Sequence, residues 1–212
     1  AAWYLFGEIL SAQKIFGIGI IIIGVYIISK SWIQKGENLK VLITGAVGFL
    51  GRECVAQFCA AGHEVITTDL HGNVDIVGDL SDSKFVQKLP NVDVVVNCAA
   101  VQYVTKNLPL IGRSIFFNKN NVDTAFNLVE RYKADDCHFV HVGTSMMYKQ
   151  INQLEYTVFS PMSGDGVYSQ SKLRAQNHVN QILKSATIIP CIIGGEGREG
   201  LFTGFVRSIK KF

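Results

Sequence analysis

The chain has little net charge and few charged residues. Its 212 residues carry 20 basic and 17 acidic side chains, and 17% of the chain is charged against 48% hydrophobic. Disordered chains combine low hydrophobicity with high net charge, and proteins that coat nucleic acid carry a strong basic surplus. The composition excludes both classes, so we expect a packed core and no nucleic-acid partner.

Closely spaced cysteine pairs are also missing. A disulfide framework uses an even set of cysteines, and a structural zinc site needs close pairs such as CxxC. Neither pattern is present, so we expect no metal, a reducing compartment, and cysteines that serve as small core residues. The five cysteines are Cys54, Cys59, Cys98, Cys137 and Cys191.

One uncharged stretch precedes the rest of the pattern. The run IFGIGIIIIGVYIIS, residues 15–29, lies between Lys14 and Lys30, with Trp3 and Trp32 farther out. A membrane-spanning helix needs about 20 apolar residues, and flanking lysines extend the span by reaching the two interfaces, where tryptophan also concentrates. We therefore expect one transmembrane helix; a buried helix, a buried strand or a secretory segment are the alternatives.

Positive charge follows this run and sets its expected orientation. Lys30, Lys35 and Lys40 stand on the C-terminal side. By the positive-inside tendency, the following domain lies on the cytosolic or mitochondrial matrix side of the membrane. Residues 1–36 are thus predicted to be a membrane anchor and linker, with the lipid bilayer as a partner.

From Val41 onward, short apolar runs alternate with helical stretches. Near-continuous apolar strands separated by helices predict a parallel sheet covered on both faces, an α/β doubly wound fold of Rossmann type over residues 37–212. The expected strands are 41–46, 64–70, 74–80, 92–100, 138–145 and 186–193, and the expected helices are 49–61, 81–89, 120–133 and 168–184.

The first expected strand runs into a glycine-rich turn, TGAVGFLG at 44–51, which opens a helix. Gly45 permits the tight turn, Gly48 lets the backbone approach a pyrophosphate, and Gly51 allows close packing of helix and strand. The new helix points its N–H groups and positive dipole end at the phosphates. This position between a strand and a helix predicts a dinucleotide site.

An acidic residue ends the second strand. Asp69 follows Gly51 by 18 positions, close to the ~20 residues at which such folds place the acid that holds the adenosine ribose. The next residues, 70–73, contain no arginine or lysine to accept a 2′-phosphate. We therefore expect NAD, with NADP less favoured; a surface acid in a turn is the alternative.

A tyrosine and a lysine lie one helical turn apart after the fifth strand. Tyr168 and Lys172 share a face of their expected helix. A phenol with its pKa near ~10 is a poor base at neutral pH unless an ammonium stabilises the phenolate. The pair predicts acid–base work on a hydroxyl or ketone. Tyr26 and Lys30 have the same spacing, but Tyr26 lies within the apolar run and Lys30 directly follows it, so we give this pair no catalytic role.

Taken in order, these motifs resemble those of the extended short-chain dehydrogenases/reductases. GDL at 78–80, NCAA at 97–100, NNV at 120–122 and YSQSK at 168–172 follow the glycine turn in the family's order, from residue 40 to about residue 200. The most similar groups are the 3β-hydroxysteroid dehydrogenases and the sugar-nucleotide epimerases. The resemblance implies an NAD-dependent oxidoreductase or epimerase.

The resemblance also implies residue roles. Thr144 would hydrogen-bond the substrate oxygen, with Ser145 as second candidate, and Asn121 would support a helix kink and a proton-relay water. Lys172 would also hold the nicotinamide ribose. Thr144 as a strand end and Asn121 as a helix cap are the structural alternatives. Dinucleotide contacts are implied for Phe49, Leu50, Asp79, Leu80, Ala99, Ala100, Tyr168 and Pro190.

Two departures leave the function open between two hypotheses. The asparagine motif reads NVDTA where the family has NVxGT, and IPCIIGG at 189–195 lacks the arginine and tyrosine of RPxxxYG. The family's C-terminal substrate lobe is expected to be absent or not included. The first hypothesis is a membrane-anchored Thr/Tyr/Lys enzyme with a lipophilic, sterol-like substrate, although fold does not fix substrate. The second is a catalytically idle accessory subunit of a membrane complex, like the one in respiratory complex I.

Overall fold

The computed structural model describes most of the chain after residue 37. Two short strands near the N-terminus, β1 (Tyr4–Leu5) and β2 (Glu8–Ile9), pair antiparallel, and residues 38–191 form a separate compact unit. The run 15–29 lies outside the described residues, so the transmembrane helix and the division at residue 36 stay predictions. No described helix is long and apolar enough to cross a membrane. The described residues are 4–5, 8–9, 38–103, 108–149 and 155–194.

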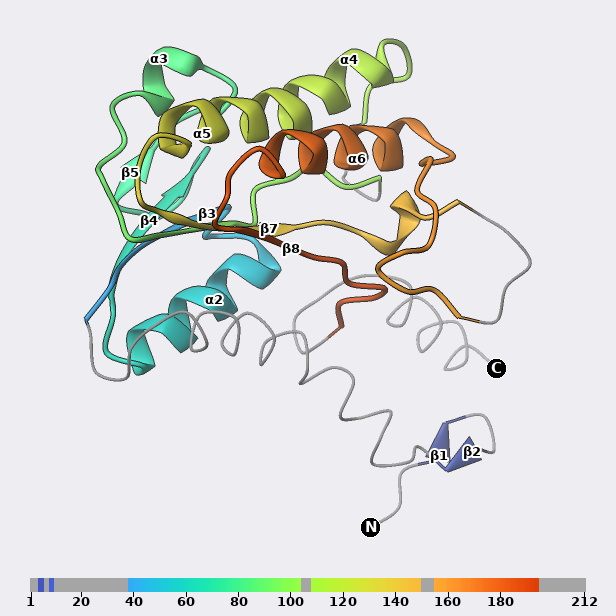
Figure 1. The fold of residues 1–212 in the computed structure, drawn as a ribbon, viewed down its shortest axis with the longest axis horizontal. Helices are drawn as coiled ribbons and strands as arrows, with labels where there is room; N and C mark the ends of the chain where they lie inside the picture. Colours follow the sequence, from blue (N-terminus) through green and yellow to red (C-terminus); the bar gives the residue numbers. More distant parts are fainter. Residues whose placement is uncertain (1–3, 6–7, 10–37, 104–107, 150–154, 195–212) are drawn as a thin grey trace. The chain divides into compact units, whose positions relative to one another are not determined.

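A six-stranded parallel sheet forms the centre of the compact unit (Figure 1). Its order is β5-β4-β3-β6-β7-β8, so the chain moves outward from β3 and then returns to pair β6 on the other side of β3. This is the doubly wound order, with its switch point between β3 and β6. The predicted Rossmann-type sheet is confirmed, with all six strands. They are β3 (Lys40–Thr44), β4 (Glu64–Asp69), β5 (Ile76–Val77), β6 (Val94–Asn97), β7 (His138–Val142) and β8 (Ser185–Ile188).

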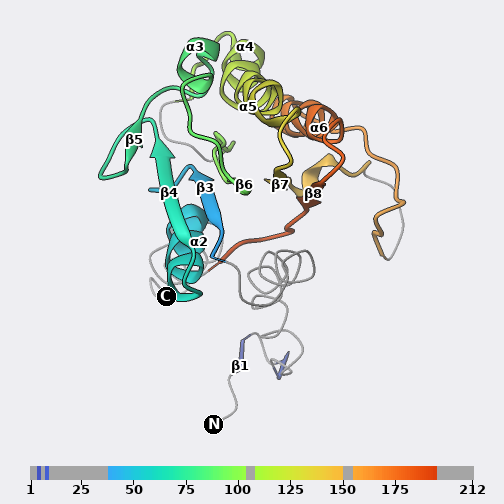
Figure 2. The same ribbon diagram turned by 60° about the vertical axis from the view of Figure 1, so that its left-hand side comes forward.

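Helices lie on both faces of this sheet. Figure 2 shows α2 (Phe49–Ala60) on one face and α3 (Ser83–Val86), α4 (Arg113–Phe117), α5 (Thr124–Tyr132) and α6 (Val167–Val179) on the other. A π-helical turn, η1 (Asn118–Asp123), joins α4 to α5, and a 3-10 turn, η2 (Ser145–Met147), follows β7.

The helical segment expected at 120–133 begins earlier in the structure than the sequence predicted. It begins at Arg113 as α4, after Gly112 in a left-handed conformation with φ +75°, and continues through η1 into α5. Its first turn was missed because Ile115 is exposed, so the apolar residues of this segment do not mark one buried face.

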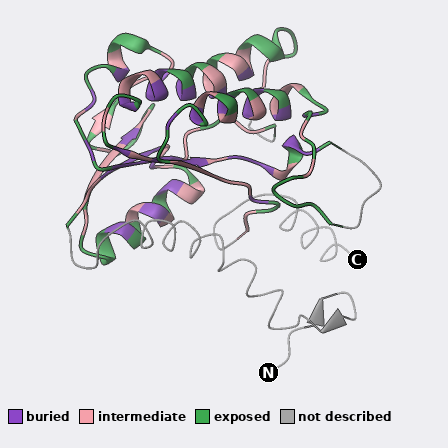
Figure 3. Ribbon diagram, in the orientation of Figure 1, coloured by how far each residue is buried: buried purple, intermediate pink, exposed green. Residues whose placement is uncertain are grey.

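The main core lies between the sheet and the α5–α6 layer. Leu42, Val95 and Phe139 occupy matched positions on β3, β6 and β7 and are fully buried. The sides of α5 and α6 that face the sheet are buried as well (Figure 3). Burying each such side chain contributes roughly 1.5–3 kcal/mol. The helical residues of this core include Leu128, Val129, Tyr132 and Val179.

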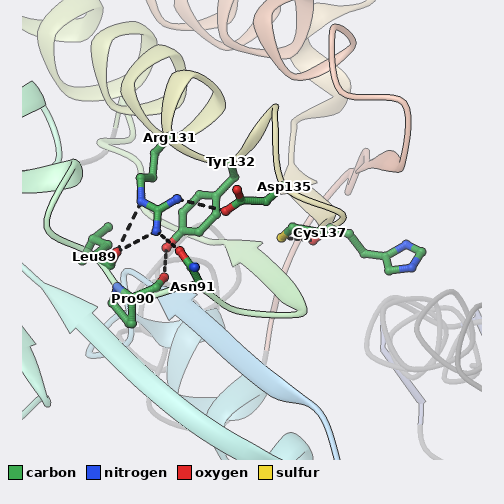
Figure 4. Close-up of polar contacts among 8 residues, drawn as sticks. Leu89, Pro90, Asn91, Arg131, Tyr132, Asp135 and Cys137 are labelled. Carbon is green, nitrogen blue, oxygen red and sulfur yellow. Dashed lines mark hydrogen bonds and ion pairs between the residues drawn. The ribbon is translucent and has the colours of Figure 1, made fainter.

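Hydrogen bonds also fix the end of α5 to the loop that precedes β6 (Figure 4). The guanidinium of Arg131 donates to the Leu89 carbonyl from Nε and Nη2, at 3.3 and 3.0 Å, and Nη1 pairs with Asp135 at 2.9 Å. Tyr132 Oη donates to the Pro90 carbonyl at 2.8 Å. These bonds hold the long helical segment that carries Asn121 in a fixed position over the sheet.

Candidate functional site

The glycine turn lies at the switch point of the sheet. Gly45 has φ +65°, and a Cβ there would lie 2.8 Å from the Ala99 backbone after β6. A Cβ on Gly51 would lie 2.1 Å from the Gly45 carbonyl oxygen. Helix α2 begins at Phe49, so its first N–H groups follow the turn directly. Gly48 is exposed, and Phe49 and Leu50 are partly exposed. The turn therefore has the close backbone packing and the accessible helix N-terminus that a pyrophosphate requires.

Asp69 ends β4 beside this turn. Its Oδ2 accepts a hydrogen bond from the Val47 amide at 3.0 Å, and its Oδ1 accepts one from the Leu70 amide at 2.7 Å. The acid predicted to hold the adenosine ribose is thus tied to the glycine turn itself, at the carboxyl edge of the sheet where ligands of this fold bind.

Asp79 and Leu80 follow β5, at the same carboxyl edge of the sheet as Asp69. Burial alone would raise the pKa of Asp79, but hydrogen bonds from Ser81 and the ammonium of Lys119, 3.4 Å away, hold that pKa below its ordinary value. The Leu80 side chain belongs to the core, and its carbonyl accepts from Asn127 at 3.0 Å. Their contact with an adenine stays a prediction.

A row of buried polar groups crosses the sheet behind Ala99. The Ala99 amide donates to Thr44 Oγ1 at 3.2 Å, and this hydroxyl donates to Asn97 Oδ1 at 2.7 Å. The Asn97 amide nitrogen then lies 3.1 Å from Nδ1 of His141. Burial, followed by the charge of Lys172, holds the pKa of His141 well below its ordinary value. A neutral imidazole therefore lies near Lys172.

Lys172 is buried although it carries a charge. It lies on α6, one turn after Tyr168, and only 2% of its surface is exposed. Burial lowers the pKa of Lys172 to about 8, and the nearby Cys98 thiol opposes that shift. The Lys172 side chain makes no hydrogen bond or ion pair with the residues that the structure describes. Its action on a bound ligand and on Tyr168 stays a prediction.

Two aromatic rings flank the catalytic candidate Tyr168. The Tyr103 and Phe117 ring centroids each lie 5.7 Å from that of Tyr168. Phe117 is buried, whereas Tyr103 is about half exposed. Tyr168 itself is partly exposed, so its ring is held by packing while the residue keeps access to solvent.

Thr144 and Pro190 lie together at the end of β7. Thr144 is 7% exposed, lies two residues beyond the strand, and its Oγ1 accepts from the Met146 amide at 3.4 Å. The Ser145 amide donates to the Pro190 carbonyl at 3.0 Å. The following turn, η2, packs against α6. This brings Thr144 to the helix that carries Tyr168 and Lys172.

Asn121 connects the loop after β6 to α6. Its Oδ1 accepts from the Val101 amide at 2.8 Å, and its Nδ2 donates to the Val101 carbonyl at 3.1 Å and to Ser171 Oγ at 2.9 Å. Asn121 lies inside η1, where a π-turn interrupts the regular helix. Its side chain bonds to other elements rather than to a helix end, so the helix-cap alternative was wrong. The proton-relay water stays a prediction.

The structure thus places most predicted residues along the carboxyl edge of the sheet and on α6. Ala99 and the exposed Ala100 follow β6 at the switch point. The sequence reasoning missed several residues of the same region. A polar residue that ends a mostly apolar strand was the signal for two of them, Thr44 and Asn97. The missed residues are Thr44, Asn97, His141, Tyr103, Phe117 and Ser171.

Comparison with known protein families agrees with this arrangement. The family model described as "NAD dependent epimerase/dehydratase family" matches residues 41–210. The chain belongs to this family. Among curated proteins, a dTDP-4-dehydrorhamnose reductase of Mycolicibacterium smegmatis is 27% identical over 173 residues, which cover 81% of this chain and 50% of that protein. The chain spans about half the length of the curated relatives it matches.

Solved structures are also similar to this chain. A dTDP-4-dehydrorhamnose reductase of Clostridium acetobutylicum has a TM-score of 0.69 and 26% identity, and the match covers 81% of this chain and 59% of that chain. The enzyme WbmH of Bordetella bronchiseptica, solved in complex with NAD+, has a TM-score of 0.72 and 20% identity over 82% of this chain and 64% of that chain, a likeness that shows the fold. The resemblance to extended short-chain dehydrogenases is confirmed at the level of this family.

Proposed function

We propose that this chain is the dinucleotide-binding part of an NAD-dependent enzyme that oxidises or reduces a sugar carried on a nucleotide. The observation that carries the proposal is the buried Lys172, one helical turn after Tyr168, on the helix that packs beside Thr144. A buried ammonium without a protein partner is costly unless its charge is used. Here it is used on a phenol and a bound cofactor.

The residues at the glycine turn fit a dinucleotide. The Cβ positions of Gly45 and Gly51 are filled by neighbouring backbone, so a close turn leads straight into the N-terminus of α2. This turn and Asp69 would hold the pyrophosphate and the adenosine ribose. When bound, NAD accepts or donates the hydride.

The chain's own residues would manage the proton. The Tyr168 hydroxyl would donate a proton to the substrate oxygen during reduction and accept it during oxidation. The Lys172 ammonium stabilises the phenolate form of that tyrosine. The Thr144 hydroxyl would hydrogen-bond the same substrate oxygen, and Asn121 keeps α6 and the loop after β6 in register through Ser171.

NAD is the proposed cofactor rather than NADP. The Asp69 carboxylate is fixed beside the glycine turn, and residues 70–73 contain no arginine or lysine to pair with a 2′-phosphate. An anionic carboxylate at this position repels that phosphate.

A sugar nucleotide is the proposed substrate class. The relatives of this chain include dTDP-4-dehydrorhamnose reductases, dTDP-glucose 4,6-dehydratases and GDP-mannose 3,5-epimerases. The sterol-like hypothesis rested on the membrane tether and on the resemblance to 3β-hydroxysteroid dehydrogenases. The relatives named above favour the sugar nucleotide instead. Anchoring by residues 15–29, with the domain on the cytosolic or matrix side, stays a proposal that rests on the apolar run between Lys14 and Lys30.

The proposal is tested with the full-length protein and a panel of nucleoside-diphosphate sugars. We expect NAD(H)-dependent turnover of at least one of these sugars. A reductase is monitored by the absorbance of NADH, and an epimerase or dehydratase is monitored by analysis of its products. Bound NAD with no turnover of any panel member, in a protein that copurifies with membrane-complex subunits, would support the idle accessory subunit instead.

A further inference from the structure

Two cysteine thiols meet directly behind the glycine turn. Cys54 lies on α2, three residues after Gly51, and Cys98 lies between the end of β6 and Ala99. Their sulfur atoms are 4.0 Å apart, although the two residues are 44 positions apart in the chain. Both are free cysteines. The spacing of the cysteines in the sequence does not reveal this pair, because the two residues come together only in the folded chain.

A disulfide between these sulfurs would require a small local movement. The S–S bond is about 2.05 Å long, so the sulfurs would have to approach by about 2 Å. Cys54 is buried, with 6% of its surface exposed, so rotation of its side chain cannot supply this movement freely. Cys98 is partly exposed, and where rotation of its side chain falls short, α2 and the loop after β6 have to move.

The glycine turn is packed between these two segments. A Cβ on Gly45 would lie 2.9 Å from the Cys98 carbonyl carbon, and a Cβ on Gly51 would lie 2.1 Å from the Gly45 oxygen. Backbone therefore contacts backbone from the Cys98–Ala99 peptide through Gly45 to the first turn of α2. Backbone movement that draws Cys54 and Cys98 together would therefore press on the turn that would hold the pyrophosphate.

The two thiols share one contact that shifts both of their pKa values. This contact lowers the pKa of Cys54. The same contact and burial raise the pKa of Cys98, and the charge of Lys172 opposes that rise. Thiolate character favours Cys54 as the first nucleophile, whereas exposure favours Cys98, and either order gives the same disulfide.

We propose that Cys54 and Cys98 form a reversible disulfide that weakens dinucleotide binding, which makes the pair a modification site within the cofactor cradle. This inference rests on the proposed function. With hydrogen peroxide as the oxidant, one of the two thiols loses its proton and its sulfur attacks one peroxide oxygen, the O–O bond breaks, and a sulfenic acid and one water, which takes up that proton, form. The sulfur of the other cysteine then attacks the oxidised sulfur, the S–O bond breaks, and a second water leaves. Two thiols lose two electrons and two protons, and the peroxide is reduced to two waters.

Cofactor binding and oxidation must oppose one another. If the disulfide form binds NAD more weakly than the dithiol form, then NAD stabilises the dithiol form by the same factor. Saturating NAD should therefore raise the proportion of the dithiol form at equilibrium in a thiol–disulfide redox buffer. The effect follows from linkage and needs no contact between the cofactor and either sulfur.

The test uses the full-length protein, hydrogen peroxide and NAD. Peroxide treatment should produce a Cys54–Cys98 cross-linked peptide in a non-reducing digest and weaken NAD binding about tenfold by calorimetry, the effect of ~1.4 kcal/mol. Dithiothreitol should restore the affinity. The Cys59→Ser variant, which changes an exposed cysteine on the same helix, should behave like the wild type. The Cys54→Ser variant should keep its affinity in peroxide.

Three results that differ from the expected one would each overturn a stated part of the inference. Absence of the Cys54–Cys98 peptide from oxidised, folded wild-type protein would overturn the site, and this readout needs no variant to fold. A mapped disulfide with unchanged NAD affinity would overturn its control of the cofactor. If the reduced protein binds no NAD, the proposed function fails, while peptide mapping still decides whether the disulfide forms.

Discussion

Asn121 donates a hydrogen bond to Ser171, the residue before Lys172, with 2.9 Å between Nδ2 and Oγ. The same amide group makes two hydrogen bonds to the backbone of Val101 in the loop after β6. One side chain in a π-turn thus sets the distance between the helix that carries the catalytic candidates and the segment that follows the dinucleotide switch point.

Replacing Asn121 by alanine should destabilise the fold. The substitution leaves the Val101 amide and carbonyl without their partner, while the Ser171 hydroxyl keeps its bond to the Tyr168 carbonyl. One unsatisfied buried polar group costs ~1–3 kcal/mol. We expect the free energy of unfolding in urea to fall by about 2–3 kcal/mol. Asn180→Ala, at an exposed position, should stay within ~0.5 kcal/mol of the wild type. Equal stability of the two variants would show that the Asn121 bonds are not needed.

Cofactor preference should depend on Asp69. The wild type should bind NAD(H) at least tenfold more tightly than NADP(H), about the effect of one lost charge-assisted contact. The Asp69→Asn substitution removes the charge that repels the 2′-phosphate. The preference for NAD(H) over NADP(H) should therefore decrease, mainly because NADP(H) binds more tightly. Calorimetric titration of both cofactors checks this, and an equal or reversed preference in the wild type would refute the role given to Asp69.

Dinucleotide affinity should depend on pH through Lys172. Its pKa, about 8 without cofactor, is lowered by burial, so the ammonium is present below pH 8 and is lost as the pH rises through that value. Because the ammonium would hold the nicotinamide ribose, the dissociation constant of NAD should rise above pH 8 by up to about tenfold per pH unit. Lys172→Met should bind weakly with little change from pH 7 to 9.5.

A surface lysine, Lys133, is the control that separates the pH dependence due to Lys172 from the loss of any one positive charge. Lys133 pairs with Glu130 on the surface, and Lys133→Met should keep the pH dependence of the wild type. If Lys172→Met also keeps it, another group titrates, and Lys172 does not hold the cofactor through its charge.

The sequence predicted the sheet well because its central strands are mostly apolar. Runs such as those around Val95 and Val140 are buried on both faces and stand between helices, which leaves few alternatives to a parallel sheet. The glycine turn was predictable because its three glycines stand between a strand and a helix. Gly45 and Gly51 are required there by close backbone packing, and Gly45 also by its φ of +65°.

Contacts between distant segments were not predictable in this way. The register that aligns Thr44 with Asn97 and Asn97 with His141 depends on strand order, which single residues do not reveal. The meeting of Cys54 with Cys98 depends on the packing of α2 under the switch point. The π-turn at Asn121 arises from bonds to Val101 and Ser171, not from helical propensity.

The apolar run 15–29 should keep the protein in the membrane. If it spans the bilayer, the full-length protein should resist extraction by alkaline carbonate, because a helix with about 15–20 buried apolar residues does not leave lipid when ionic contacts are removed. Deletion of residues 1–36 should release a domain that stays in solution. Extraction of the full-length protein by carbonate would remove the transmembrane assignment.

The most direct test of the proposed enzyme is the Tyr168→Phe variant. Tyr168 is the acid–base group placed for the substrate oxygen, and general acid–base assistance contributes ~10²–10⁴-fold to rate. Turnover of the sugar nucleotide should therefore fall by about that factor, while calorimetric NAD affinity stays close to wild type because the phenyl ring keeps its packing against Tyr103 and Phe117. Undiminished turnover in a folded Tyr168→Phe protein that binds NAD would contradict the assignment of Tyr168 as the catalytic acid and base.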